Sequence, residues 1–360
     1  MTDICRHRYR HGLGFGLVEL MIALLLAAFL IGGILQIFFS AKKSYTLQEN
    51  MAQLQDSGRN ALYLIAEDIR MAGYWGCGTK PPLVSGLNGS NFFNAFAKPL
   101  QGFEASTDTK TQPATWSPAL DASFLTTPYT PLPGSDVLTL RRANAPGITV
   151  SSHESKSAPL LLAATGTQLA QAEISEENIS KGLLAIVVPS DCSQPEAFQI
   201  TGLQGNAIAH IAAPKNNGNQ TNELTNTYPN GKVHTAHTIS YFVGENPNQE
   251  KLLFRRVDNQ KALEELELVD GVEEMQVLYG IDTDPDKDEA PNYYVTANQV
   301  PENNWQNVTS IRVSFLVASL DDRVADVSIP YRFNGVEKTP ADHKLRRVFT
   351  STIKIRNRFH

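Results

Sequence analysis

The longest apolar run of the chain lies near its N-terminus. No charged residue occurs from Leu20 to Phe39, and Gln36 is the one polar interruption. About 20 apolar residues in a helix are enough to cross the hydrocarbon core of a bilayer. We therefore expect residues 15–39 to form a membrane helix.

The pattern after this run is that of a one-sided helix. Apolar residues recur at spacings of three and four, which is typical of an amphipathic helix. The first proline is Pro81, and Gly73 is a common kind of helix stop. One helix of about 55 residues, roughly 80 Å long, should result, with residues 40–72 packed on a folded head and Gly32-Gly33 as a bend or locally melted turn. The apolar stripe is Leu47, Met51, Leu54, Gly58, Ala61, Leu62, Ile65, Ile69 and Ala72, and the expected polar face is Lys42, Lys43, Gln48, Glu49, Gln53, Asp56, Arg59, Glu67 and Asp68.

Residues 73–360 should form a periplasmic, β-rich head. Within it, residues 79–134 are rich in Gly, Pro, Ser, Thr and Asn, and their weak periodicity predicts a long irregular loop. One long helix followed by several strands predicts an α+β fold, with the helix packed on an antiparallel sheet. The expected strands are Val137–Arg141, Leu183–Val188, Phe198–Thr201, Thr238–Val243, Leu252–Val257, Met275–Tyr279, Ser310–Ala318 and Val348–Ile355.

The residues before the apolar run are basic, with Arg6, Arg8 and Arg10, which places the short N-terminus in the cytoplasm. Three interpretations compete. A cleaved secretory signal has an apolar region of about 7–15 residues, shorter than this one. A plain membrane anchor leaves Glu19 without a role, although a carboxylate in lipid is costly and is usually functional. The third interpretation takes the basic leader, the Gly14–Phe15 junction, the acid at the fifth position after it and the apolar helix together, and this combination resembles the class III signal of type IV pilins.

Further motifs narrow the resemblance to the PilW-type minor pilins. Arg70-Met71-Ala72-Gly73-Tyr74-Trp75-Gly76-Cys77, at the end of the long helix, is similar to the corresponding segment of that family. So are four later stretches, and the resemblance thins out across residues 79–134 and 205–235. The later stretches are Ser135–Leu140, Ser190–Cys192 with Phe198–Thr201, Glu267–Glu273 with Tyr279–Asp282, and Arg346–Thr350 with Ile355–Arg358.

The resemblance implies a function in type IV pilus assembly. Residues 1–14 would be a leader that a prepilin peptidase removes after Gly14, followed by methylation of Phe15. Glu19 would pair with the N-terminal amine of a neighbouring pilin. The product would be a single-pass inner-membrane protein of a Gram-negative bacterium that joins other minor pilins and the major pilin to prime the fibre. Alternatives are a tip adhesin or surface sensor and a minor pseudopilin of type II secretion.

Cysteine content and charge refine this picture. Cleavage after Gly14 would discard Cys5 and leave Cys77 and Cys192 in the periplasm. An even pair in an oxidising compartment predicts a disulfide, with two free buried thiols as the alternative. The net charge of −6 would become about −8 without the leader. The chain has no basic patch interleaved with aromatic residues, so we expect no nucleic-acid partner.

We find no catalytic motif and expect neither an enzyme nor a required cofactor. His234 and His237 have no third metal ligand nearby and are expected to be solvated loop residues. Calcium is the one candidate ligand, because the alternating Asp282, Asp284, Asp286 and Asp288 could surround a hard cation. Two positions depart from a calcium hand, since Lys287 replaces the glycine and Tyr293 the bidentate glutamate. A solvated acidic turn is the alternative.

Overall fold

The computed structural model describes residues 16–77, 83–88, 92–106, 115–213, 218–259, 262–286 and 288–357. The chain divides into two compact units, with the boundary between Ala52 and Gln53. Helix α1 (Leu17–Met71) contributes to both units. We call the second unit, from Gln53 onward, the head, and it contains all the described strands.

Helix α1 is one α-helix of 55 residues. It continues through Gly32 and Gly33, so the prediction of a locally melted turn is wrong. Each glycine costs about 1 kcal/mol relative to alanine, and the strong helix formers on both sides outweigh that cost in a long cooperative helix. The helix ends as predicted, two residues before Gly73, whose φ of +74° lies in the left-handed region that glycine readily adopts.

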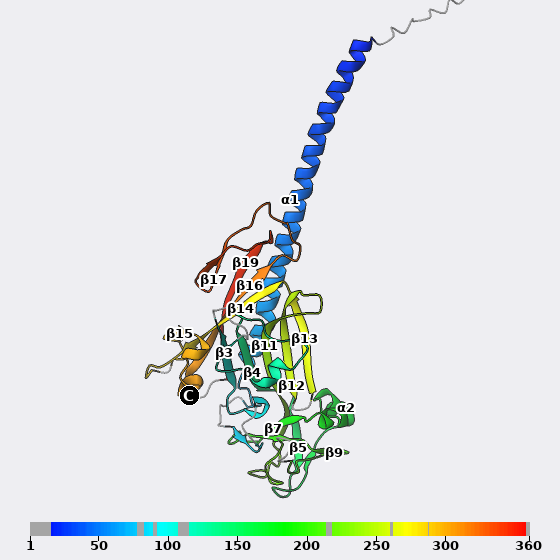
Figure 1. The fold of residues 1–360 in the computed structure, drawn as a ribbon. Helices are drawn as coiled ribbons and strands as arrows, with labels where there is room; N and C mark the ends of the chain where they lie inside the picture. The colour runs from blue at the N-terminus through cyan, green and yellow to red at the C-terminus, as the bar shows by residue number, and fades with distance from the viewer. Residues whose placement is uncertain are drawn as a thin grey trace, which may run out of the picture. The chain divides into compact units, whose positions relative to one another are not determined.

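The head is built mainly from strands (Figure 1). The fold is α+β, as the hydrophobic pattern predicts. Its strands are β1 (Val84–Ser85), β2 (Leu100–Ala105), β3 (Trp116–Ser117), β4 (Val137–Ala143), β5 (Ile148–Ser152), β6 (Leu160–Leu162), β7 (Leu184–Val188), β8 (Glu196–Gln199), β9 (Gly202–Gln204), β10 (Ala207–Ala209), β11 (Lys232–Glu245), β12 (Lys251–Asn259), β13 (Ala262–Asp270), β14 (Val272–Ile281), β15 (Tyr293–Val295), β16 (Val308–Ala318), β17 (Tyr331–Phe333), β18 (Val336–Lys338) and β19 (Arg346–Lys354). Its short helices are α2 (Gly166–Gln171), α3 (Glu176–Ser180) and the 3₁₀ helices η1 (Phe92–Asn94), η2 (Ala122–Leu125), η4 (Ala297–Gln299) and η5 (Glu302–Asn307).

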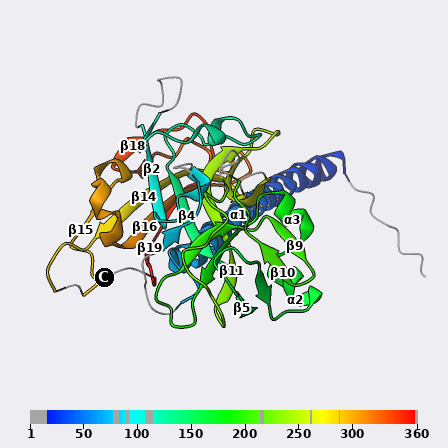
Figure 2. The same cartoon turned by 90° about the horizontal axis from the view of Figure 1, so that it is seen from below.

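Strand β11 connects the parts of the larger sheet. Its first residues, Lys232–Thr235, pair with β7, and the stretch from Ala236 to Tyr241 pairs with β4. The later residues, Thr238–Glu245, pair with β12. These pairings are antiparallel, and in the described part of the chain only β1 and β8 pair in parallel. At the end of this sheet that β10 and β9 form, α2 and α3 lie beside these two strands (Figure 2).

A second sheet has four strands in the order β15-β14-β16-β19. Strands β14, β16 and β19 run side by side in Figure 1. Their inward residues, such as Val277 and Phe315, join one core with β11, β12 and the later part of α1. On the helix, Leu54, Ala61 and Ile65 are fully buried in this core. Burial of this apolar stripe is the main force that holds the helix on the sheets.

The described part of residues 79–134 is not the irregular loop that its composition predicts. It contains β2, which pairs with β4, and it contributes four aromatic residues to a buried cluster: Phe92, Phe103, Trp116 and Phe124. Phe124 lies edge-on to Phe92 and Phe242, with ring centroids 5.3 and 6.2 Å apart. Single aromatic anchors without periodicity stabilise this segment, and a search for repeating patterns misses them.

Candidate functional sites

The processing site predicted from the sequence, Gly14 and Phe15, lies outside the described residues. The next residue, Gly16, donates its backbone N–H to Glu19 Oε2 at 3.1 Å. Glu19 stands in the first turn of α1, where backbone N–H groups lack partners within the helix and favour a negative charge. Within the described residues this is the one hydrogen bond of the Glu19 carboxylate, and the side chain is exposed.

The apolar side chains that follow Glu19 are exposed without a break as far as Phe39. The most apolar 18-residue stretch of α1 has no part buried inside the protein. The helix is long and apolar enough to cross a membrane, in agreement with the hydrophobic pattern. Such a surface is stable in lipid or against other apolar helices, and it is unfavourable in water.

Farther along α1, the side chain of Asp68 is buried against the sheet and only 7 % exposed. Its Oδ1 accepts from Arg142 Nε at 3.0 Å, and its Oδ2 accepts from Arg255 Nε at 2.9 Å and from the Tyr241 hydroxyl at 2.7 Å. The sequence pattern assigns Asp68 to the polar face of the helix, and that assignment is wrong. Asp68 follows Leu64 by four residues and precedes Ala72 by four, a spacing that places it on the packed face.

These contacts keep Asp68 ionised. Burial alone would raise the pKa of its carboxyl, but Arg255, Arg142 and the Tyr241 hydroxyl outweigh it and hold the pKa below the ordinary value. The same contacts join α1 to β4, β11 and β12. Asp68 therefore fixes the orientation of the helix on the sheet more specifically than apolar contact alone would.

A disulfide joins Cys77, six residues after the end of α1, to Cys192, with an S–S distance of 2.10 Å and a Cα–Cα distance of 6.0 Å. The structure thus has the predicted bond and not two free thiols. The bridge closes a segment of 115 residues in sequence separation and attaches the helix exit to the loop between β7 and β8.

A buried carboxyl pair lies between β2 and β14. Asp136 accepts the backbone N–H groups of Ala105 (2.9 Å) and Val277 (2.8 Å). Gln276 Nε2 donates to both carboxyls, at 2.7 Å to Asp136 Oδ2 and at 3.1 Å to Glu104 Oε1. Glu104 Oε2 is buried without a partner. Burial raises the pKa of Glu104.

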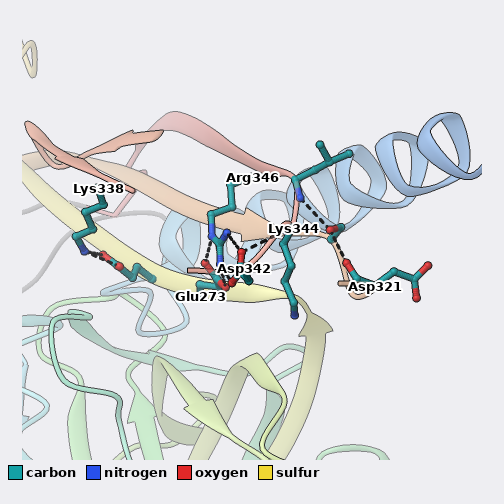
Figure 3. A network of polar contacts seen from close by, with 9 residues as sticks. Glu273, Asp321, Lys338, Asp342, Lys344 and Arg346 are labelled. Atoms are coloured by element: carbon teal, nitrogen blue, oxygen red, sulfur yellow. Dashed lines mark hydrogen bonds and ion pairs between the residues drawn. The ribbon is translucent and has the colours of Figure 1, made fainter. Parts of the chain in front are cut away.

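A cluster of ion pairs around Arg346, called the Arg346 cluster, stabilises the end of the four-stranded sheet (Figure 3). Arg346 makes two contacts with each of two carboxylates, at 2.6 and 2.9 Å to Glu273 and at 2.6 and 2.7 Å to Asp342. Lys338 pairs with Glu274 beside it, at 2.7 Å. Hydrogen bonding to Arg346 lowers the pKa of Asp342 to about 2. Bidentate geometry at a largely buried arginine gives strong, oriented ion pairs. The sequence alone did not show that these residues come together.

His234 and His237 are not solvated loop residues, contrary to the sequence-based prediction. Both lie in β11 and are buried, on opposite faces of the strand since they are three residues apart. His237 Nε2 lies 2.7 Å from Glu173 Oε2, and His234 Nδ1 lies 2.8 Å from the backbone oxygen of Asn144. The structure does not bring the two rings together as a metal pair.

The four aspartates of the acidic loop follow β14. One oxygen each of Asp282, Asp284 and Asp288 lie within 4.8 Å of one another, and Asp286 is outside this group. Lys287 lies outside the described residues. The loop is therefore a crowded carboxylate cluster and not an evenly solvated turn.

Comparison with known proteins bears on the C-terminal part of the head. Residues 240–357 match the family model of the Type IV Pilus-assembly protein W, PilW. The match covers about a third of the chain and includes the four-stranded sheet and the Arg346 cluster. No curated protein and no solved structure matches the chain.

The matched region and the exposed apolar helix point to the same kind of protein. One apolar N-terminal helix, long enough to cross a membrane, is present, and this is compatible with single-pass membrane anchoring of a pilus-assembly protein. The match over residues 240–357 supports a PilW-type type IV pilus protein.

Proposed function

We propose that the protein is a minor pilin that primes the type IV pilus together with other minor pilins. The observation that supports this most directly is helix α1, whose exposed apolar residues follow a single acid, Glu19. In the proposed sequence of events, a prepilin peptidase cleaves after Gly14, Phe15 is methylated, and the helix holds the protein in the inner membrane until it enters the fibre.

Glu19 has a definite part in this proposal. It lies four residues after Phe15, a spacing that puts two residues on the same face when both are in one helix. A carboxylate in lipid is tolerated when it pairs with a cation, and the N-terminal amine of a neighbouring pilin is such a cation. The hydrogen bond from Gly16 leaves the carboxylate exposed and able to accept a further donor.

The test is the substitution Glu19→Ala in the full-length chain, with Glu49→Ala on the same helix as the control. Glu49 is also exposed and lies beyond the apolar run. We expect Glu19→Ala to be inserted and to show an N-terminus at Phe15 by mass spectrometry, but to be depleted from sheared pili. Glu49→Ala should be incorporated normally. Wild-type amounts of Glu19→Ala in sheared pili would contradict the proposal.

Two companion experiments test processing and priming. A Gly14→Leu variant should accumulate as uncleaved precursor in the membrane. A deletion strain should lose surface pili and twitching, and disabling retraction should restore pili if the protein promotes initiation without being an obligatory part of the shaft. A deletion strain with normal piliation and impaired surface attachment would favour an adhesin instead.

A further inference from the structure

The acidic loop combines crowding with incomplete hydrogen bonding. Asp282 comes directly after β14, and its side chain is buried, with 6 % of the residue exposed. Its Oδ2 accepts the backbone N–H of Glu289 at 3.1 Å. Its other oxygen, Oδ1, is buried and has no hydrogen-bond partner. A buried carboxylate oxygen without a donor is costly, so this atom indicates a missing positive partner.

Asp284 also has a carboxylate oxygen that no donor reaches. Its Oδ2 accepts from Asn292 Nδ2 at 2.5 Å, and its buried Oδ1 has no donor, with the carboxylates of Asp282 and Asp286 as its neighbours. Asp288 is exposed, and its Oδ1 accepts the backbone N–H of Ala290 at 2.7 Å. In the described part of this loop, Lys354 pairs with Glu289, at 2.9 Å, and not with any of these three aspartates.

We propose that Asp282, Asp284 and Asp288 bind a calcium ion. Calcium takes 6–8 oxygen ligands at about 2.3–2.6 Å, so oxygens on opposite sides of the ion lie about 5 Å apart. The three carboxylate oxygens, all within 4.8 Å of one another, fit within that shell. Water would complete the coordination.

The site is not a calcium hand. It draws on three carboxylates of one short loop, and Tyr293 stands where a hand has its bidentate glutamate. With few protein ligands, we expect a Kd of about 10⁻⁴–10⁻³ M, the range of extracellular modules. Magnesium should bind more weakly, because it requires near-ideal octahedral geometry and gives up its water reluctantly.

Binding would order the connection between β14 and β15. Asn292, which donates to Asp284, also accepts the backbone N–H of Thr283 at 2.7 Å, so the two ends of the loop are already linked. Neutralising the aspartates would remove their mutual repulsion and stabilise this link. Because Lys354 of β19 pairs with Glu289 in the same loop, the ion would also stabilise the edge of the four-stranded sheet.

The test uses the full-length chain in detergent, stripped with chelator and titrated with calcium chloride by calorimetry and thermal melting. We expect saturable binding of one ion and a melting temperature several degrees higher in excess calcium. The variant Asp288→Asn changes an exposed ligand and should weaken binding about tenfold or more, equivalent to about 1.4 kcal/mol.

Asp286→Asn is the matched control. It removes the same charge from the same loop, but its carboxylate is outside the group of three and accepts the backbone N–H of Asp288 at 3.3 Å. An asparagine side-chain oxygen can still accept that bond, so the affinity should change by less than in Asp288→Asn. Equal losses in the two variants would indicate diffuse charge attraction and overturn the site. A calcium-independent melting curve with no heat of binding would also overturn it. Neither result would affect the proposed role in pilus priming, which depends on α1.

Discussion

The two parts of helix α1 differ in what covers their apolar side chains. Up to Ala52 these side chains are largely exposed, whereas from Leu54 onward an apolar stripe is buried in the core of the head. The acids follow the same division. Glu19 is exposed and contacts the backbone of Gly16, and Asp68 is buried with two arginines and a tyrosine. In the later part of α1, the rest of the chain covers the apolar side chains and pairs with the acid. In the earlier part, lipid or other helices must cover them.

The largest expected effect comes from removing Asp68. Asp68→Ala leaves Arg142 and Arg255 without their shared carboxylate and should cost about 3–5 kcal/mol of unfolding free energy, as for a broken buried ion pair. The control is Asp56→Ala, an exposed position on the same helix, which should cost little. Chemical denaturation of the full-length protein in detergent measures both. Equal stability of the two variants would mean that the buried contacts of Asp68 contribute no more to stability than an exposed acid of the same helix part.

A smaller and opposite pair of effects should follow from one substitution made in each part. A Cβ on Gly58 would lie 2.3 Å from the ring of Phe349, so Gly58→Ala should destabilise the head by about 1–3 kcal/mol through overpacking. A Cβ on Gly33 would meet no atom within 4 Å, and Gly33→Ala should be neutral or stabilise the helix. Thermal melting compares them.

The double variant Gly58→Ala with Phe349→Leu checks the mechanism of that effect. A smaller side chain at position 349 makes room for the new methyl group, so the double variant should recover part of the loss. No recovery would mean that Gly58 is needed for a reason other than the close approach of the ring.

The smallest expected effect concerns Glu104, a buried acid that, unlike Asp68, has no arginine partner among the described residues. Its raised pKa means that the folded state holds the proton more tightly than the unfolded state does. This contribution to stability is full below the unfolded pKa of about 4.3 and is lost as pH rises through the folded pKa. Glu104→Gln should therefore flatten the decline of the melting temperature as pH rises above about 4.3. An unchanged pH profile would mean that the slope comes from other groups.

The acid Asp68 has the reverse dependence. Its pKa is lowered, so the stability that it contributes is present above the unfolded pKa and is lost as pH falls through the folded pKa. Stability therefore falls with decreasing pH through Asp68 and with increasing pH through Glu104. The presence of an arginine partner at Asp68, and its absence at Glu104, accounts for the difference.

The features that repeat over many residues were predictable from the sequence. The course of α1 to its end near Gly73 and the α+β class follow from the hydrophobic pattern. Strand β13 was not predicted. Its leucines, Leu263, Leu266 and Leu268, stand among glutamates and do not alternate regularly with them, and the outer edge of the strand is exposed. Its identity as a strand depends on pairing with β12, which local pattern does not contain.

The polar contacts of the head were the least predictable. Asp68 meets Arg255 across 187 positions of the chain, and Arg346 meets Glu273 across 73. Such pairs depend on how the helix and the sheets pack, and no local spacing encodes them. The disulfide and the acidic loop could be predicted from the sequence. Cysteine pairing follows from the redox compartment, and the aspartates are close to one another in the chain.

The disulfide gives the head a particular response to mechanical load. A pilus protein pulled through its N-terminal helix transmits tension along the backbone until it reaches Cys77, and there the covalent bridge passes the load directly to Cys192. The residues between the two cysteines carry none of it. A segment of this size, extended, would add roughly 400 Å at about 3.5 Å per residue. In the oxidised protein that length cannot be released, so the strand pairs that lie wholly between the two cysteines keep their pairing even when the rest of the head is under tension. These pairs are β2 with β3, β2 with β4, and β5 with β6.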